Sequence, residues 1–164
     1  MANRRTKLID IYNSDTIVRT FILFSQTARG VLKYIDAYLY RKARLSTVQL
    51  IVLKTLASNG GVMTPSEIAE WTQTERNNIT TLVQRMKQDG LVTAERNSSN
   101  RRIMNVTLTN KGREVLDQAM PVAEESVSQV MLSITEGDAI LLEKLLRVIR
   151  QNAQSGLEDL TKRT

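Results

Sequence analysis

The chain has 164 residues and a net charge of +6, and 41% of its residues are hydrophobic. This length suffices for one domain with a sizeable core, and an aromatic content of only 4% means that Leu, Ile, Val and Met build most of it. The absence of Cys and His excludes disulfides, thiol chemistry and the usual zinc sites, so we expect no metal and no cofactor. No apolar run reaches the length of a signal peptide or a membrane span, and we therefore expect a cytoplasmic protein that does not bind membranes.

Basic residues are concentrated between positions 76 and 113, where eight Lys and Arg stand against two acidic residues. This local surplus equals the net charge of the whole chain, +6. A cationic stripe is expected of a protein that neutralises the phosphates of a nucleic acid. A solvated charged face is the alternative, and charge alone does not decide between the two.

Two helices are predicted in the first third of the chain. The first is capped by Ser14 or Asp15, carries apolar residues at helical spacing from Ile17 to Tyr38, and extends over about 25 residues or more. Ser46 caps the second, which we expect to end at Asn59-Gly60-Gly61. The predicted apolar face of this second helix comprises Leu50, Ile51, Leu53 and Leu56.

A third and a fourth helix follow. Thr64-Pro65-Ser66-Glu67 is a capping box with proline at the first helical position, and Thr74 is expected to cap the fourth helix. The fourth helix has a predicted buried stripe at Ile79, Leu82, Val83 and Met86. Its polar and basic positions are Arg76, Asn77, Asn78, Thr80, Thr81, Gln84, Arg85 and Gln88.

The polar side of the fourth helix has the chemistry that base reading needs. Asn and Gln can pair bidentately with adenine, Thr can offer its hydroxyl or methyl group to thymine, and Arg76 or Arg85 can reach guanine or phosphate. A helix that is merely solvated would more often show Glu and Lys one turn apart. The pattern therefore favours a DNA-reading helix over a solvated face.

A hairpin is predicted next, with strands at Leu91 to Arg96 and Ile103 to Leu108. The turn Asn97-Ser98-Ser99-Asn100 is followed by Arg101 and Arg102, which suit a narrow minor groove, although two solvated arginines are the alternative. We expect Ser99, Asn100, Arg101 and Arg102 to form the DNA-binding wing. The predicted fold is mainly α with a small β-hairpin wing, an α+β winged helix-turn-helix.

The C-terminal third is predicted to be helical. Pro121 should bend or break its first helix near Met120. The first and last helices of the chain are more apolar than one small unit could cover, so we expect two chains to bury them against each other. The expected divisions are a dimerisation region at 1–44, a DNA-binding unit at 45–112 and dimerisation helices at 113–164, within one compact domain.

The stretch from about Leu45 to Gly112 resembles the MarR family of bacterial transcriptional regulators. Each matching fragment is weak alone, but the ordered set is fairly specific. It comprises Leu45-Ser46-Thr47-Val48-Gln49, Asn78-Ile79-Thr80-Thr81-Leu82-Val83, Arg85-Met86-Lys87-Gln88-Asp89-Gly90-Leu91-Val92, Asn100-Arg101-Arg102 and Leu108-Thr109-Asn110-Lys111-Gly112. The tail from Ser133 to Ile149 also resembles the last helix of the family.

The resemblance implies a sequence-specific regulator of double-stranded DNA, most often a repressor. It implies that Asn77, Asn78, Thr80 and Thr81 lie in the major groove, with Arg101 and Arg102 at the wing and the capping residues Thr64 and Thr74 near the DNA. It also implies a homodimer on an inverted repeat, with recognition helices ~34–36 Å apart. The family wing usually has aspartates where this chain has Asn97 and Asn100, and an amide holds a guanidinium less firmly than a carboxylate does.

Family members often bind a small phenolic or other aromatic anion between the dimer helices and the winged unit. Tyr34, Tyr38, Arg41 and Trp71 are candidates for such a pocket. Because the two tyrosines lie one helical turn apart, plain packing at an interface is the stronger alternative.

Catalysis is not expected. The chain has no His or Cys for a nucleophile and base, and no glycine-rich phosphate loop. A non-specific architectural or RNA-binding winged module without ligand control is the competing function, and it would bind unrelated DNA nearly as well as a promoter. The sequence leaves open the target genes, the effector, and whether binding represses or activates.

Overall fold

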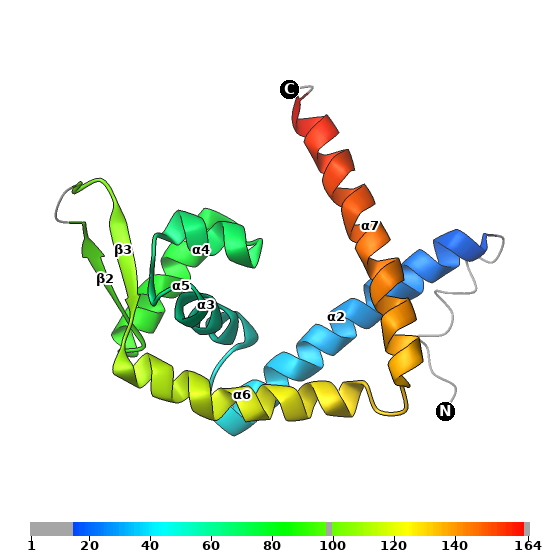
Figure 1. The fold of residues 1–164 in the computed structure, drawn as a ribbon, viewed down its shortest axis with the longest axis horizontal. Helices are drawn as coiled ribbons and strands as arrows, with labels where there is room; N and C mark the ends of the chain where they lie inside the picture. The colour runs from blue at the N-terminus through cyan, green and yellow to red at the C-terminus, as the bar shows by residue number, and fades with distance from the viewer. Residues whose placement is uncertain (1–14, 98–99, 163–164) are drawn as a thin grey trace. The chain divides into compact units, whose positions relative to one another are not determined.

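The computed structural model describes residues 15–97 and 100–162, which are mostly helical with one small sheet (Figure 1). Packing separates two compact units at Val127. The elements are α2 (Thr16–Ala43), α3 (Thr47–Ser58), β1 (Val62–Met63), α4 (Pro65–Thr72), α5 (Arg76–Gln88), β2 (Val92–Arg96), β3 (Met104–Leu108), α6 (Asn110–Val130) and α7 (Glu136–Lys162). Within the described part of the chain, none of the helices has the length and apolar character needed to cross a membrane.

Helices α2 and α3 begin at side-chain caps. The Asp15 carboxylate accepts the Ile17 N–H, which confirms one of the two predicted caps and a long first helix of 28 residues; Ser14 lies outside the described residues. Ser46 and Gln49 cap α3 reciprocally, so the second predicted cap is also confirmed. An Asp36 carboxylate oxygen accepts the backbone N–H of Thr47 at 2.8 Å, which ties α2 to the start of α3.

The buried face of α3 differs from the predicted one. Leu50, Leu53 and Leu56 are buried as expected, but Val52 is buried too and Ile51 is 44% exposed. Helix α3 packs against α2, α4 and β3 at once. Because three neighbours pack against α3, they bury a different and wider part of its surface than the single stripe predicted from the sequence. The buried part includes Val52, and Ile51 lies outside it.

The core of the first unit joins every element of the winged part. From α5, Ile79, Val83 and Met86 are buried, whereas Leu82 is half-buried, so three of the four predicted stripe residues are in the core. The other buried apolar residues are Leu39, Leu45, Leu50, Val52, Leu53, Leu56, Met63, Ile68, Ala69, Leu91, Val92, Ala94, Val106, Leu116 and Ala119.

The predicted hairpin is confirmed, and a third strand joins it. Strands β2 and β3 pair antiparallel from Val92 opposite Leu108 to Arg96 opposite Met104. The two-residue β1 pairs with the other edge of β3, so the strand order is β1-β3-β2. A strand this short shows no alternation in the sequence, which is why it was not predicted.

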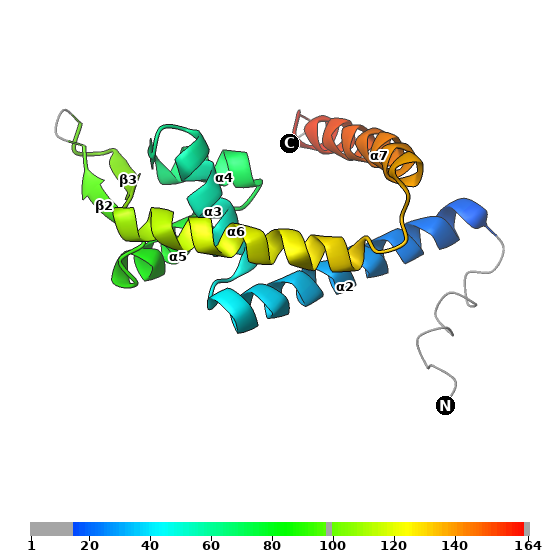
Figure 2. The same ribbon diagram turned by 60° about the horizontal axis from the view of Figure 1, so that its bottom comes forward.

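The start of α6 is fixed against the end of α5. The Thr109 hydroxyl donates to the carbonyl oxygens of Gly90 and Leu91, at 2.8 and 3.0 Å, and accepts the Gly112 N–H at 2.9 Å. The Lys111 ammonium donates to the Asp89 carbonyl oxygen at 2.6 Å. Helix α6 therefore begins at the base of the hairpin, at the end remote from the wing tip (Figure 2).

The predicted break at Pro121 does not occur, because α6 continues through this residue to Val130, and the alternative, a bend near Met120, stays a prediction. Leu116 and Ala119 are buried before the proline and Ser126 is buried after it. Packing on both sides holds the helix together and offsets the backbone hydrogen bond that proline removes.

In the second unit, α7 begins at a further reciprocal cap, in which Thr135 and Asp138 satisfy each other's backbone N–H groups. None of the residues of α7 is buried. Large apolar side chains are exposed along it, at Ile140, Leu141, Leu142, Leu145, Val148, Ile149, Leu157 and Leu160.

We predict that Gly112→Ala lowers the free energy of unfolding by about 1–3 kcal/mol, because an added Cβ would lie 2.1 Å from the Leu91 carbonyl oxygen. Gly30→Ala is the matched control. Its Cβ meets nothing within 4 Å, and in the middle of α2 it should instead raise the free energy of unfolding by about 0.5–1 kcal/mol. Urea unfolding followed by circular dichroism measures both; equal stability of wild type and Gly112→Ala would contradict the proposed close approach.

Candidate nucleic-acid interface

Helix α5 begins one residue later than predicted. Glu75 is its N-cap residue and makes no side-chain cap bond. The Thr74 hydroxyl donates to the Thr72 carbonyl oxygen at 3.2 Å instead, so the prediction that Thr74 caps this helix is wrong. The reason lies in the preceding residue, because the chain leaves α4 through Gln73 in the left-handed region, at φ 51°.

The polar residues of α5 share the surface that faces away from the core. Ile79 and Val83 are buried, and at about 100° per residue Asn77 and Thr81 lie almost directly opposite them. All the predicted recognition positions are exposed, namely Arg76, Asn77, Asn78, Thr80, Thr81, Gln84 and Arg85. The structure thus brings them onto one accessible helix, and their contact with bases stays a prediction.

Both threonines of this surface turn their hydroxyl groups back to the helix. Thr80 donates to the Arg76 carbonyl oxygen at 3.0 Å, and Thr81 donates to the Asn77 carbonyl oxygen at 3.2 Å. A carbonyl oxygen can only accept, so the single proton of each hydroxyl is committed to the backbone.

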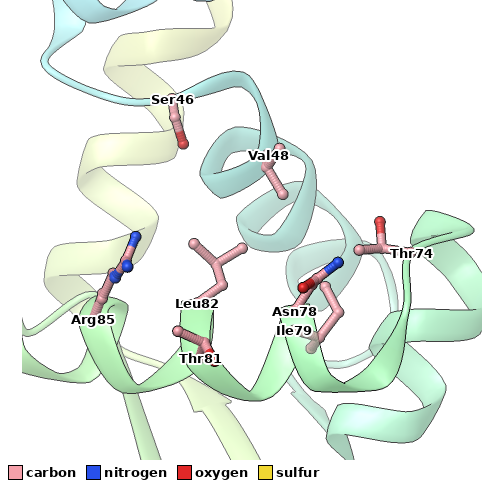
Figure 3. A pocket seen from close by; sticks show the side chains of 8 residues that line it. All are labelled: Ser46, Val48, Thr74, Asn78, Ile79, Thr81, Leu82 and Arg85. Atoms are coloured by element: carbon pink, nitrogen blue, oxygen red, sulfur yellow. The ribbon is translucent and has the colours of Figure 1, made fainter.

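One flank of α5 forms an open hollow of about 460 Å³ with the start of α3 (Figure 3). Leu82 and Arg85 point from α5 toward α3 across this hollow (Figure 3). Its lining comprises Ser46, Val48, Thr74, Asn78, Ile79, Thr81, Leu82 and Arg85, and includes none of the four residues proposed from the sequence as a ligand pocket. Ser46 and Val48 were missed because their proximity to α5 depends on helix packing.

A second hollow, of about 400 Å³, lies on the other flank of α5, between the start of α4 and the turn end of β3 in the wing. It brings Arg76 and Arg102 together with the N-terminus of α4, and no carboxylate lines it. Two guanidinium groups with no carboxylate beside them are a favourable setting for a phosphate. The lining residues are Thr64, Pro65, Ser66, Arg76, Thr80, Arg102, Ile103 and Met104.

The start of α4 is locked by the predicted capping box. The Thr64 N–H donates to a Glu67 carboxylate oxygen at 2.7 Å, and the Glu67 N–H donates to the Thr64 hydroxyl at 3.2 Å. The hydrogen bonds from the backbone and then the side chain of Thr64 lower the pKa of Glu67 below its ordinary value of 4.5. This confirms Thr64 as a cap and keeps Glu67 ionised at neutral pH.

The wing is organised by amide side chains. The Asn97 side-chain oxygen accepts the Asn100 N–H, and the Asn100 side-chain oxygen accepts the Arg102 N–H, both at 3.1 Å. Arg96, Arg101 and Arg102 line a third hollow with Ile103 and Met104, and no carboxylate is among the lining residues. No carboxylate in this hollow therefore neutralises the wing arginines. Ser99, the remaining predicted wing residue, lies outside the described residues.

The residues proposed from the sequence for a ligand pocket come from two helices. On α2, the rings of Tyr34 and Tyr38 pack with centroids 5.8 Å apart, and Arg41 is exposed. Trp71 lies on α4 with 65% of its surface exposed. Their part in ligand binding stays a prediction.

The winged unit also matches a known protein family. A family model described as the MarR family matches residues 45–103, the segment that runs from α3 to the end of the wing. Among curated proteins, the chain is 28% identical over 132 residues to the transcriptional repressor IacR of Pseudomonas putida, which covers 80% of this chain and 74% of that protein. Residues 45–103 of this chain are therefore similar to the MarR family.

Solved structures of MarR-type regulators share the fold. Sco3205 of Streptomyces coelicolor, solved in complex with DNA, superposes with a TM-score of 0.76 at 23% identity, over 84% of this chain and 89% of that one. The organohalide-sensing regulator RdhR, solved with 2,4-dichlorophenol, gives a TM-score of 0.78 at 22% identity, over 86% and 83% of the two chains. The winged helix-turn-helix fold predicted from the sequence is confirmed.

We predict that Glu67→Gln lowers stability at neutral pH and that this difference disappears in acid. A carboxyl group whose pKa is lowered by folding stabilises the folded state above its unfolded pKa, and this stabilisation is lost as the pH falls through the folded pKa. The free energies of unfolding of wild type and variant should therefore converge as the pH falls below about 4.5. Chemical unfolding across that pH range measures this, and a difference that is independent of pH would show that the Glu67 charge is not involved.

Proposed function

We propose that the chain is a repressor that binds an inverted-repeat operator as a homodimer. In this proposal, residues 45–112 bind the DNA, and the segments 1–44 and 113–164 hold the two copies together. The observation that carries the proposal is that the exposed polar surface of α5 lies beside the cationic hollow, which joins Arg76 of α5 to Arg102 of the arginine-rich wing. The curated relative is itself named a repressor.

Different parts of the proposed DNA-binding surface contact phosphates and bases. Phosphate contacts position a protein on DNA, whereas contacts with base edges determine the sequence. The hollow that contains Arg76 and Arg102 suits a backbone phosphate, and the neighbouring Asn77 and Thr81 have the uncharged groups that read bases in the major groove. With α5 in the major groove, the wing arginines extend to the adjacent minor groove, where narrow stretches concentrate negative potential.

Homodimerisation is supported by unpartnered apolar surface. Helix α7 has no buried residue, and the first half of α2 exposes Ile17, Phe21 and Leu23. A soluble chain rarely leaves such long apolar faces in water, and a second copy offers the same faces in return. Pairing would place two copies of α5 on successive major grooves, which is the reason for expecting an inverted repeat.

Control by a small aromatic molecule is the second part of the proposal. RdhR, which shares the fold, was solved with 2,4-dichlorophenol. In this chain, Tyr34, Tyr38 and Trp71 offer aromatic surface and Arg41 offers a cation, which together suit a phenolic or other aromatic anion. Release of the operator by such a molecule follows if it binds the free regulator more tightly than the DNA-bound one.

The competing function, a non-specific architectural or RNA-binding winged module, is less well supported. A protein that binds only backbone gains most from Lys and Arg, yet the centre of the exposed α5 surface carries Asn77, Thr81 and Gln84. The proposal is tested by selecting duplexes from a random library with the full-length protein. A regulator should enrich one inverted repeat, which should also occur upstream of its own gene, whereas an architectural protein should enrich none.

We predict that Arg102→Ala and Asn77→Ala weaken DNA binding in different ways. Arg102→Ala should weaken binding to all duplexes and reduce the slope of log K against log salt by about 1 for each subunit. Asn77→Ala should cost about 1–3 kcal/mol on the selected duplex and little on unrelated DNA. Fluorescence anisotropy at several salt concentrations measures both effects.

Lys54→Ala is the control for Arg102→Ala, because it removes one exposed positive charge on α3 outside the proposed surface. It should change neither the affinity nor the salt slope by much. If Asn77→Ala weakened binding equally on selected and unrelated DNA, the assignment of α5 to base reading would be wrong.

We also predict that Leu145→Glu on α7 separates the dimer. A carboxylate in an apolar interface should raise the dissociation constant of the two copies at least about tenfold. Gln151→Glu is the control, since it adds the same charge on another side of the same exposed helix. Sedimentation equilibrium measures the association, and a Leu145→Glu protein that pairs as tightly as wild type would place the interface elsewhere.

A further inference from the structure

Thr81 lies near the middle of the exposed surface of α5, almost opposite the buried residues Ile79 and Val83. It is therefore central to the surface that the proposed function directs into the major groove. Its hydroxyl proton is committed to the Asn77 carbonyl oxygen at 3.2 Å. The groups that remain for a base are the methyl group and the lone pairs of the oxygen, so Thr81 in this conformation cannot donate to the acceptor atoms of guanine.

The surroundings of Thr81 favour an apolar partner. Thr81 lines the hollow between α5 and α3 together with the apolar side chains of Val48 and Leu82 (Figure 3). Val48 is 43% exposed and Leu82 is half-buried, so apolar surface is accessible beside the threonine. In the major groove, the one apolar group that a base presents is the C5 methyl group of thymine.

Thr80 makes the same backbone hydrogen bond but has different surroundings. It lines the hollow on the opposite flank, with Arg76 and Arg102, where a phosphate is the expected partner. The two adjacent threonines thus share their backbone hydrogen bonding and differ in what lies beside them. This makes Thr80 a matched internal comparison for Thr81.

We propose that Thr81 is a specificity-determining residue that identifies thymine by contact between its methyl group and the thymine methyl group. This inference rests on the proposed function, because it requires α5 to lie in the major groove. It adds the base that one residue selects and the chemical group by which the residue selects it. The hydroxyl serves to fix the side chain on the helix and makes no contact with the base.

The experiment combines two substitutions in the protein with one in the DNA. Thr81→Ser removes the methyl group and keeps the hydroxyl, whereas Thr81→Val keeps a methyl group and replaces the hydroxyl. The probe is the duplex that wild-type protein selects from a random library, with its thymines replaced by uracil one position at a time in both half-sites. Uracil lacks only the C5 methyl group, and fluorescence anisotropy gives each dissociation constant.

At one thymine position, the uracil duplex should bind wild type and Thr81→Val about fourfold more weakly per half-site, the factor that corresponds to burying one methyl group. Thr81→Ser should bind the thymine duplex about fourfold more weakly than wild type does. Its affinities for the thymine and uracil duplexes should differ by less than about twofold. Thr81→Val should bind the thymine duplex within about twofold of wild type. Thr80→Ser should retain the full preference of wild type for thymine at that position.

Two results would overturn the inference while leaving the proposed function in place. One is that no thymine position shows a smaller uracil effect in Thr81→Ser than in wild type. The other is that Thr81→Val loses as much affinity as Thr81→Ser, which would assign the contact to the hydroxyl. A wild-type protein that selects no sequence at all would instead refute the proposed function together with this inference. Thermal unfolding of each variant verifies that the fold is retained.

Discussion

The contact between the segment after α5 and the start of α6 determines how α5 is attached to the rest of the winged unit. Thr109 donates to the carbonyl oxygens of Gly90 and Leu91, and Lys111 donates to that of Asp89, the C-cap residue of α5, so the segment that follows α5 is held by the start of α6. Gly112 permits this contact because any side chain there would collide with Leu91. The same contact holds the base of the hairpin, since β2 begins at Val92 and β3 ends at Leu108. Helix α5, the wing and α6 are thus attached at one point.

The other attachment of the winged unit is at the start of α3, where the Asp36 carboxylate of α2 accepts the Thr47 N–H. A carboxylate at a helix N-terminus is stabilised by the free N–H groups there. Leu39 near the end of α2 and Leu45 in the connection between the two helices are fully or almost fully buried. A ligand that bound on α2 would therefore have a packed route to α3, and α3 shares a hollow with α5 through Ser46 and Val48. This gives the proposed ligand control a physical path to the DNA-binding surface.

Features that depend on a few neighbouring residues could be predicted from the sequence. The caps at Ser46 and at Thr64 could both be predicted, and so could the reciprocal partner of Thr64 three residues along; the reciprocal partner of Ser46, Gln49, was not predicted. The hairpin and the buried stripe of α5 follow from alternation and helical spacing in the same way. These patterns depend on the order of neighbouring residues, so they can be recognised before the packing of the elements is known.

Features that depend on packing could not be predicted. Thr74 was taken for a cap because it has the right side chain, but the left-handed Gln73 moves the helix start past it. Pro121 was expected to interrupt α6, yet burial of residues on both sides outweighs one lost hydrogen bond. In the candidate site, the sequence identified the arginines and the polar side of α5, whereas the hollows that flank this helix became visible only with the fold.

The distribution of charge suggests why a single winged unit would discriminate poorly on its own. Among the described residues, the one ion pair joins Arg147 and Glu143 on α7, so the arginines of the wing and of α5 are all available to phosphates. Phosphate contacts strengthen binding to every sequence alike, and only a few uncharged side chains on α5 remain to prefer one sequence, each worth about 1–3 kcal/mol. Binding as a pair doubles the free energy of discrimination and therefore squares the specificity ratio. In the proposed dimer, the exposed apolar faces of α2 and α7 would therefore be as important for sequence selection as the proposed base-reading residues.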